Sequence, residues 1–139
     1  MFHIAWGGLL CTQYMRALCP EAKPFGVMRL PTFTTLGASG PIASAGIRPK
    51  AAIWHISQKD AERLDSEYEL IEGMVRATTI FKSKGVEFPA SIYLATSAKY
   101  ALEFTMTYLH MIRKGYDEWG FPQSDLDEVV SLLGQAVAA

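Results

Sequence analysis

The chain has 139 residues, of which 50% are hydrophobic and 19% are charged, and its formal net charge is −1. This composition is typical of a globular protein with a buried core, and it argues against a disordered chain. It also argues against nucleic acid as a partner, because phosphate binding needs a clustered excess of Lys and Arg. At this length we expect one domain spanning residues 1–139.

The cysteines and the apolar segments indicate the compartment. Cys11 and Cys19 are the only cysteines. Two are too few for a disulfide scaffold, so a reducing cytosol is the default. The N-terminus lacks the positively charged lead of a signal peptide. The uncharged stretch from Leu30 to Ile47 is interrupted by Pro and Gly, which argues against a membrane helix. The sequence therefore predicts a cytoplasmic protein with no membrane partner.

The first predicted elements are a buried strand from Phe2 to Trp6 and a short helix that Thr12 caps and Pro20 closes. Gly7 and Gly8 stand between them. Paired glycines after a strand mark backbone that turns sharply or approaches another group closely. The segment is therefore either a plain turn or a cradle that holds a ligand with backbone N–H groups.

A β-like region follows and is broken by turn residues. Three short runs predict strands at Phe25–Met28, Phe33–Leu36 and Ala51–Ile56. The loop Gly37–Pro41 is one residue away from a serine-hydrolase elbow, but Pro41 stands where that motif has its last Gly. We therefore assign no nucleophilic serine to this loop.

The clearest helix start lies at Ser57. Ser57 can cap the helix, and Asp60 suits its first turn and dipole. Apolar residues then recur at spacings of three and four on one face: Ala61, Leu64 and Tyr68. The neighbouring side of the helix is more polar and carries Glu62, Asp65 and Glu69.

A hairpin and two helices complete the chain. The hairpin joins strands at Val75–Phe81 and Phe88–Ala95 through a turn at residues 82–85. One long helix is predicted from Ser97 to Trp119, and Ser124 caps a last helix. Because strands and helices do not alternate regularly, the predicted class is α+β.

The histidines indicate neither metal nor cofactor chemistry. His3, His55 and His110 stand far apart and lack the paired spacing of a zinc site. We interpret them as packed or surface residues, and we expect no metal and no cofactor. The aromatic residues have core spacing without basic residues between them, so base stacking is not indicated.

Several short motifs along the chain are more specific together than any one of them alone. Residues 5–10 read AWGGLL, and residues 15–30 read MRALCPEAKPFGVMRL. Further on come Leu64-Asp65 in the predicted helix, Tyr93 in a strand and Lys114-Gly115 in the long helix. In this order the motifs resemble the gamma-glutamylcyclotransferase-like family, whose members commonly begin Ala-Tyr-Gly-Ser-Asn-Leu. The resemblance covers nearly the whole chain.

The resemblance implies a small mixed β-barrel flanked by helices, with a cavity at one end. Enzymes of this family release 5-oxoproline from gamma-glutamyl compounds, so the implied partner is a small molecule with a gamma-glutamyl or similar acyl head. The implied substrate-binding residues are those of the glycine turn and one strand tyrosine: Trp6, Gly7, Gly8, Leu9, Leu10 and Tyr93. In the mechanism that the resemblance implies, an acid after Leu-Asp takes a proton from the substrate's α-amine, which attacks its own γ-carbonyl.

Counting residues from the Leu-Asp motif does not decide which residue is the catalytic acid. In the family's pattern two residues separate Leu-Asp from the catalytic Glu, and counting without a gap lands on Tyr68. One inserted residue gives Glu69, which is our candidate, and Glu72 and Glu67 remain in reserve. The competing interpretation is that Glu69 only solvates a helix end.

Departures from the family's pattern leave three hypotheses open. Trp6, Gly8 and Leu9 replace the family's Tyr, Ser and Asn, Leu70 replaces the Gly after the acid, and Val75 falls near a common Tyr position. Side-chain hydrogen bonds from Ser and Asn are lost, while backbone N–H donors remain. The protein is therefore a cyclotransferase-like enzyme, an amide-cleaving relative acting on another acyl head, or a catalytically silent binding module.

Overall fold

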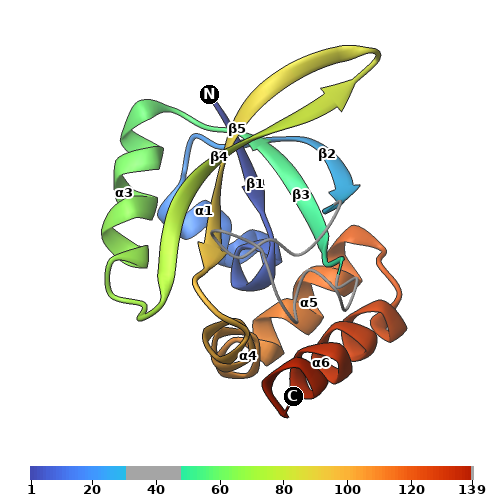
Figure 1. Cartoon of the computed structure of the whole chain (residues 1–139). Coiled ribbons are helices and arrows are strands. Elements are labelled where there is room, and N and C mark those ends of the chain that lie inside the picture. The colour runs from blue at the N-terminus through green and yellow to red at the C-terminus, as the bar shows by residue number, and fades with distance from the viewer. Residues whose placement is uncertain (31–47, 139) are drawn as a thin grey trace.

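The computed structural model describes residues 1–30 and 48–138, and their strands form one mixed sheet (Figure 1). The strands are β1 (Phe2–Ala5), β2 (Lys23–Arg29), β3 (Lys50–His55), β4 (Met74–Ser83) and β5 (Val86–Ala95). Their order is β2-β3-β1-β5-β4, with β1 and β5 parallel and the other three pairings antiparallel. The α+β class is confirmed. In the described part of the chain the edge strands β2 and β4 are not paired, so this sheet stays open where the resemblance implies a barrel.

The helices flank this sheet. They are α1 (Thr12–Leu18), α3 (Gln58–Tyr68), α4 (Ala98–Thr107), α5 (Leu109–Trp119) and α6 (Gln123–Ala138), and a 3-10 turn, η1, spans Gly7–Leu10. In Figure 1, α3 lies along one side of the sheet, while α4, α5 and α6 gather at the end away from the projecting β4–β5 hairpin. None of the helices in the described ranges is both long and apolar enough to cross a bilayer.

Several predicted boundaries are confirmed by local hydrogen bonds. Ser57 and Asp60 form a reciprocal capping box at the start of α3. Ser97 caps α4 by accepting a hydrogen bond from the backbone N–H of Tyr100, 3.2 Å away. Lys84 and Gly85, with φ of 52° and 78°, form the predicted turn of the β4–β5 hairpin. Two residues with positive φ match the right-handed twist of the flanking strands.

Three predictions about helices are wrong. Thr12 is the first residue of α1 and not its cap, and its hydroxyl donates to the Glu118 carboxylate. The last helix begins at Gln123, before Ser124. The long helix is interrupted at Tyr108, whose backbone (φ −103°, ψ 15°) leaves the helical region between α4 and α5.

The interruption at Tyr108 has a packing reason. It redirects α5 onto the 3-10 turn, where a side chain at Gly115 would lie 2.6 Å from the backbone carbon of Leu10. A continuous helix would carry these residues away from the turn. The predicted strand Phe33–Leu36 and loop Gly37–Pro41 lie outside the described residues.

The two faces of the sheet differ in character. Side chains alternate along each strand, so His3 and Tyr93 face α3, where the Tyr68 ring stacks on Tyr93. Ile4 and Ile92, which are paired between β1 and β5, face the other way and belong to the buried core. This alternation positions two separate cavities.

Candidate functional site

The glycine turn lies against aromatic rings. All four residues of η1 are buried, and Gly7 has a φ of 68° that a side chain would strain. A Cβ on Gly7 would also lie 2.5 Å from the Phe104 ring, and one on Gly8 would lie 3.5 Å from Tyr108. Gly7 is therefore required both by its backbone conformation and by the close approach of Phe104.

Trp6 and Leu10 tie the two ends of this turn to its surroundings. The Trp6 indole donates a 2.6 Å hydrogen bond to the carbonyl of Tyr93, and its ring lies 5.3 Å from that of Phe104. The Leu10 carbonyl accepts a 3.0 Å hydrogen bond from the Trp119 indole. The turn thus holds strand β5 on one side and helix α5 on the other.

A small pocket of about 260 Å³ lies beside the end of α3. It is lined by Asp65, Tyr68, Glu69, Met74, Arg76 and Tyr93. We refer to these six residues as the small pocket. Asp65 and Glu69 are four residues apart and so lie on the same side of the helix. The pocket brings together two carboxylates, two phenols and one guanidinium.

Asp65 is the centre of the polar contacts in the small pocket. Its Oδ1 accepts a 2.5 Å hydrogen bond from the Tyr93 hydroxyl, and its Oδ2 accepts a 2.8 Å ion-paired hydrogen bond from Arg76. Burial and the bond to Asp65 raise the pKa of Tyr93 well above its usual range. Tyr93 therefore keeps its proton and acts as a hydrogen-bond donor.

Tyr68 forms the apolar wall of the same pocket. Its ring is stacked on Tyr93 with 4.0 Å between centroids and 10° between planes. Burial raises the pKa of Tyr68 well above its usual range. The position at which an ungapped count expects the family's Glu therefore holds a neutral, buried phenol.

The three candidate acids have different surroundings. Glu69 follows the last helical residue of α3, is exposed, and lines the small pocket together with Tyr93. Glu67 accepts a 3.0 Å hydrogen bond from Tyr14, and Glu72 accepts one of 3.0 Å from Tyr100. Neither of these two residues lines the small pocket. Glu69 is thus the one of the three that shares this space with Tyr93.

The two ion-paired residues of the small pocket, Asp65 and Arg76, were not singled out as functional by the sequence. Asp65 was noted only in the Leu-Asp motif and on the polar side of the helix, and Arg76 was assigned no role. Their signal was register: Arg76 pairs with Tyr93 across β4 and β5, which places both side chains on one face. Asp65 then reaches both from one turn of α3.

His3 is a buried polar residue on the same face of the sheet as Tyr93. Its Nδ1 lies 2.8 Å from the Ser91 hydroxyl, and its ring lies 5.4 Å from that of Tyr93. Burial, helped by the Arg76 charge, lowers the pKa of His3 to about 3, so the imidazole is neutral near pH 7. In the described residues no group of three His, Cys, Asp or Glu side chains could hold a metal ion.

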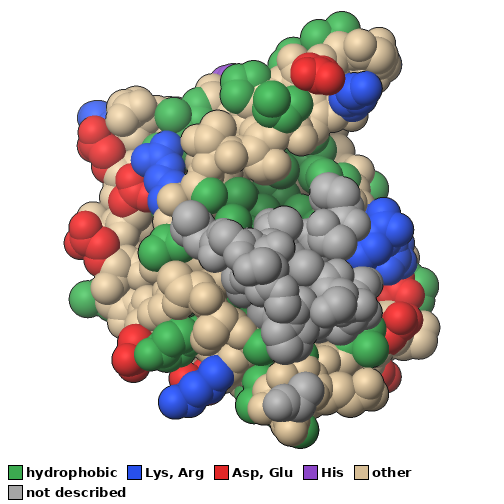
Figure 2. Space-filling view, viewed as in Figure 1, with side chains coloured by type: hydrophobic (Ala, Val, Ile, Leu, Met, Phe, Trp, Pro, Cys, Tyr) green, Lys and Arg blue, Asp and Glu red, His purple; other side chains and the backbone are tan. Residues whose placement is uncertain are grey.

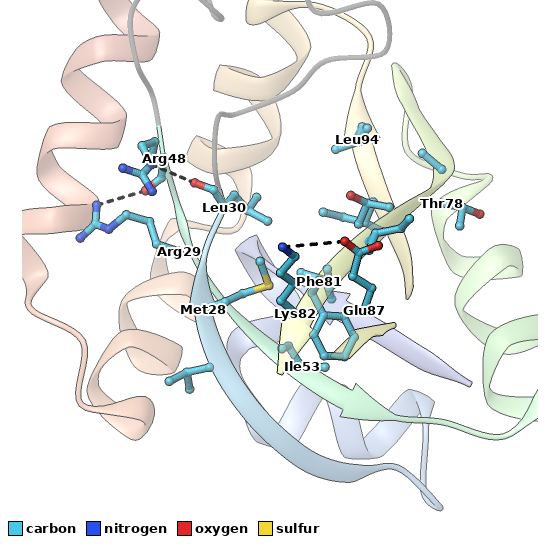
Figure 3. Close-up of a pocket in the computed structure, with 16 residues that line it drawn as sticks. Met28, Arg29, Leu30, Arg48, Ile53, Thr78, Phe81, Lys82, Glu87 and Leu94 are labelled. Carbon is cyan, nitrogen blue, oxygen red and sulfur yellow. Dashed lines mark hydrogen bonds and ion pairs between the residues drawn. The ribbon is translucent and has the colours of Figure 1, made fainter. Parts of the chain in front are cut away.

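A larger cavity of about 610 Å³ lies on the opposite sheet face (Figure 3). Its wall is mostly apolar, and Arg29, Arg48, Lys82 and Glu87 supply its charged groups. We call it the large cavity. Figure 2 shows hydrophobic side chains in the hollow below the β4–β5 hairpin, which carries the exposed Lys82–Glu87 pair. Nothing in the sequence indicated this cavity beyond the alternation of its strands.

Solved structures share this arrangement of sheet and helices. A protein described as a gamma-glutamyl cyclotransferase matches with a TM-score of 0.63 and 20% identity, over 93% of this chain and 85% of the other. The chain has the gamma-glutamylcyclotransferase-like fold. An uncharacterized protein from Homo sapiens also matches this chain, with a TM-score of 0.61 and 20% identity, over 91% of this chain and 85% of the other. No protein-family model and no curated protein sequence matches the chain.

Proposed function

We propose that this chain cleaves a small gamma-glutamyl amide and releases 5-oxoproline, with Glu69 as the general acid and base. The observation that supports this proposal is the small pocket itself, where Glu69, Tyr93 and Arg76 border one space of about 260 Å³. A carboxylate, a protonated phenol and a guanidinium are the groups that a gamma-glutamyl head needs around it.

In the proposed reaction Glu69 removes a proton from the substrate's α-amine. The amine nitrogen attacks the γ-carbonyl carbon, and a five-membered ring forms. The amide C–N bond then breaks, and Glu69 returns its proton to the leaving amine. No water is consumed, and the pocket mainly has to hold the folded substrate in place.

The other residues of the small pocket orient the substrate in this proposal. Arg76 is exposed and meets Asp65 through one nitrogen, Nη1, so its remaining donors serve a substrate carboxylate. Tyr93 is held from both ends, by Asp65 at its hydroxyl and by Trp6 at its carbonyl. Trp6 thereby positions strand β5, and the substrate-binding role of Trp6, Gly7, Gly8, Leu9 and Leu10 stays a prediction.

A second candidate function is a catalytically silent binding module. It is favoured by the Phe104 and Tyr108 rings, which lie where a ligand would approach Gly7 and Gly8. The buried Tyr68 at the ungapped position of the acid favours it too. Such a module would bind a small acid in the pocket without turning it over.

The test is a screen of gamma-glutamyl amides for released 5-oxoproline, followed by Glu69→Gln on the best substrate. We expect Glu69→Gln to fold and to bind substrate, and to lose turnover by roughly 10²–10⁴-fold, the usual contribution of a positioned acid or base. Glu62→Gln, on the exposed side of the same helix, is the matched control and should change little.

Two outcomes would contradict the proposal, the first its catalytic residue and the second its enzymatic activity. Full activity in Glu69→Gln would remove Glu69 from the mechanism and direct the search to Glu72→Gln and Glu67→Gln. No 5-oxoproline from any amide, with binding of a gamma-glutamyl compound to the wild type that Arg76→Gln weakens, would establish the binding module instead.

A further inference from the structure

We propose that the large cavity is a second ligand site, which takes an amphipathic molecule with an apolar body and one carboxylate or similar anionic group. The site lies apart from the small pocket and does not depend on the function proposed above. Its support comes from three observations: its placement, its size and wall, and the charges at its rim.

The placement separates the two sites. Tyr93 and Arg76 line the small pocket, whereas their neighbours Ile92, Leu94 and Ala77 line the large cavity. Successive residues of a strand point to opposite faces. The sheet itself therefore lies between the two spaces, and an occupant of one does not enter the other.

The size and the wall suit an apolar ligand. A volume of about 610 Å³ lies within the roughly 300–1,000 Å³ typical of small-molecule sites. Ile4, Ile53 and Ile92 come from three adjacent strands and are 1%, 5% and 3% exposed. Figure 3 shows Met28 and Leu30 on one side of this space, with Leu94 and Thr78 on the other. Such a wall offers apolar contact along the length of an extended ligand.

The charges at the rim favour an anionic group. Three cations and one carboxylate line the cavity: Arg29, Arg48, Lys82 and Glu87. Arg29 is paired with Asp125 at 2.9 Å and Lys82 with Glu87 at 3.8 Å. These two pairs leave one positive charge at the rim.

Arg48 carries that remaining charge. Its Nε donates a 3.2 Å hydrogen bond to the Leu30 carbonyl. No carboxylate of residues 1–30 or 48–138 pairs with it. Since a guanidinium has five donors in a planar fork, its other nitrogens suit a bidentate carboxylate.

The experiment measures binding of sodium decanoate by isothermal titration calorimetry, with decan-1-ol as the uncharged analogue. We expect one decanoate per chain and a weaker affinity for decan-1-ol. Absence of decanoate binding would overturn the site. Equal affinities for the two molecules would overturn its preference for an anion.

Two substitutions locate the bound molecule. Ala77→Trp fills the cavity and should weaken decanoate binding by at least about tenfold, whereas Ala17→Trp, on the exposed side of α1, should not. Arg48→Gln should weaken decanoate binding roughly fivefold, as expected for one partly exposed charge pair, and should leave decan-1-ol unaffected. Arg113→Gln, whose partner is Asp127, is its control.

The thermal unfolding midpoint of each variant shows that it is folded. If Ala77→Trp does not fold, Arg48→Gln still tests the site, because its side chain is exposed. Decanoate binding that neither substitution changes lies elsewhere on the protein, and the proposal is then wrong.

Discussion

The two sides of the sheet use the same strands for opposite purposes. On the α3 side, Asp65, Arg76 and Tyr93 form a chain of short polar contacts around the small pocket. On the other side, residues of β4 and β5 that include Ala77, Ile92 and Leu94 line a mostly apolar space more than twice as large. Residues that line the polar pocket and residues that line the apolar cavity are thus direct neighbours in the sequence.

This difference follows from the period of the strands. A strand with one solvated face alternates between buried and exposed residues, whereas a strand with a site on each face is buried on both. In β5 the run Ser91-Ile92-Tyr93-Leu94 alternates between a hydroxyl and an aliphatic side chain, and all four residues are buried. Burial on both faces leaves the hydroxyls inside the protein, where they need partners.

The largest expected effect comes from comparing one substitution on each face of the sheet, with catalysis and decanoate binding measured for both variants. Glu69→Gln should lower turnover by roughly 10²–10⁴-fold and leave decanoate affinity within about twofold, because distant sites act independently. Ala77→Trp should weaken decanoate binding by at least about tenfold and leave turnover unchanged. The measurements are 5-oxoproline release and decanoate titration on both variants, and loss of both activities in either variant would mean that the faces are coupled.

The next effect concerns adjacent residues of β5. Leu94→Ala should lower the free energy of unfolding by about 2 kcal/mol, the low end for a buried leucine, because the side chain already borders a cavity. Tyr93→Phe removes only the hydroxyl bonded to Asp65 and should lower the free energy of unfolding by about 1 kcal/mol. It should lower kcat/KM by roughly 10–10²-fold through lost positioning.

Urea unfolding and steady-state kinetics separate these two residues. Leu94→Ala is expected to keep its kcat, since the side chain points away from the small pocket. A kcat that falls as far in Leu94→Ala as in Tyr93→Phe would remove the distinction between the faces.

A third prediction uses pH. The pKa of His3 lies at about 3 in the folded chain, against an ordinary 6.5. Between these values the unfolded chain binds a proton that the folded chain does not, so stability decreases as pH falls. The loss is about 1.4 kcal/mol per pH unit well below pH 6.5, or about 2 kcal/mol between pH 6.5 and 4.5.

Urea unfolding at several pH values checks this prediction. His3→Gln should remove the slope, whereas His110→Gln should not, because His110 is exposed. An unchanged slope in His3→Gln would assign the pH dependence to other groups.

The sequence predicted several local structures that one or two residues decide, although the caps at Thr12 and Ser124 were wrong. Ser57 with Asp60, Ser97 and the turn at Lys84-Gly85 act through contacts within a few residues, so their patterns could be recognised without the fold. The interruption at Tyr108 could not be predicted in this way. It depends on α5 packing against Leu10, about a hundred residues away in sequence.

The same limit applies to the site. Periodicity placed Leu64 and Tyr68 on the core face of α3, and both are buried. Nothing in the helix alone indicated that Asp65 would meet Tyr93 and Arg76, because those contacts depend on the pairing of β4 with β5. Which acid serves the proposed reaction stays a prediction, since it depends on a one-residue insertion relative to the family's pattern.

The smallest effect compares the ion pairs on the two faces. Asp65 and Arg76 are 37% and 40% exposed, lie 2.8 Å apart and share the Tyr93 hydroxyl. Lys82 and Glu87 are 73% and 59% exposed and 3.8 Å apart. An exposed ion pair is screened by solvent, and holding its two side chains together costs conformational entropy. A double-mutant cycle should therefore give a coupling energy of about 1 kcal/mol for Asp65–Arg76 and roughly 0.2 kcal/mol for Lys82–Glu87. Added salt should weaken both pairs, but the coupling that Tyr93 supports should persist. Equal coupling energies would mean that the hydrogen bond from Tyr93 contributes nothing to the polar face, and Tyr93→Phe should then leave the Asp65–Arg76 coupling unchanged.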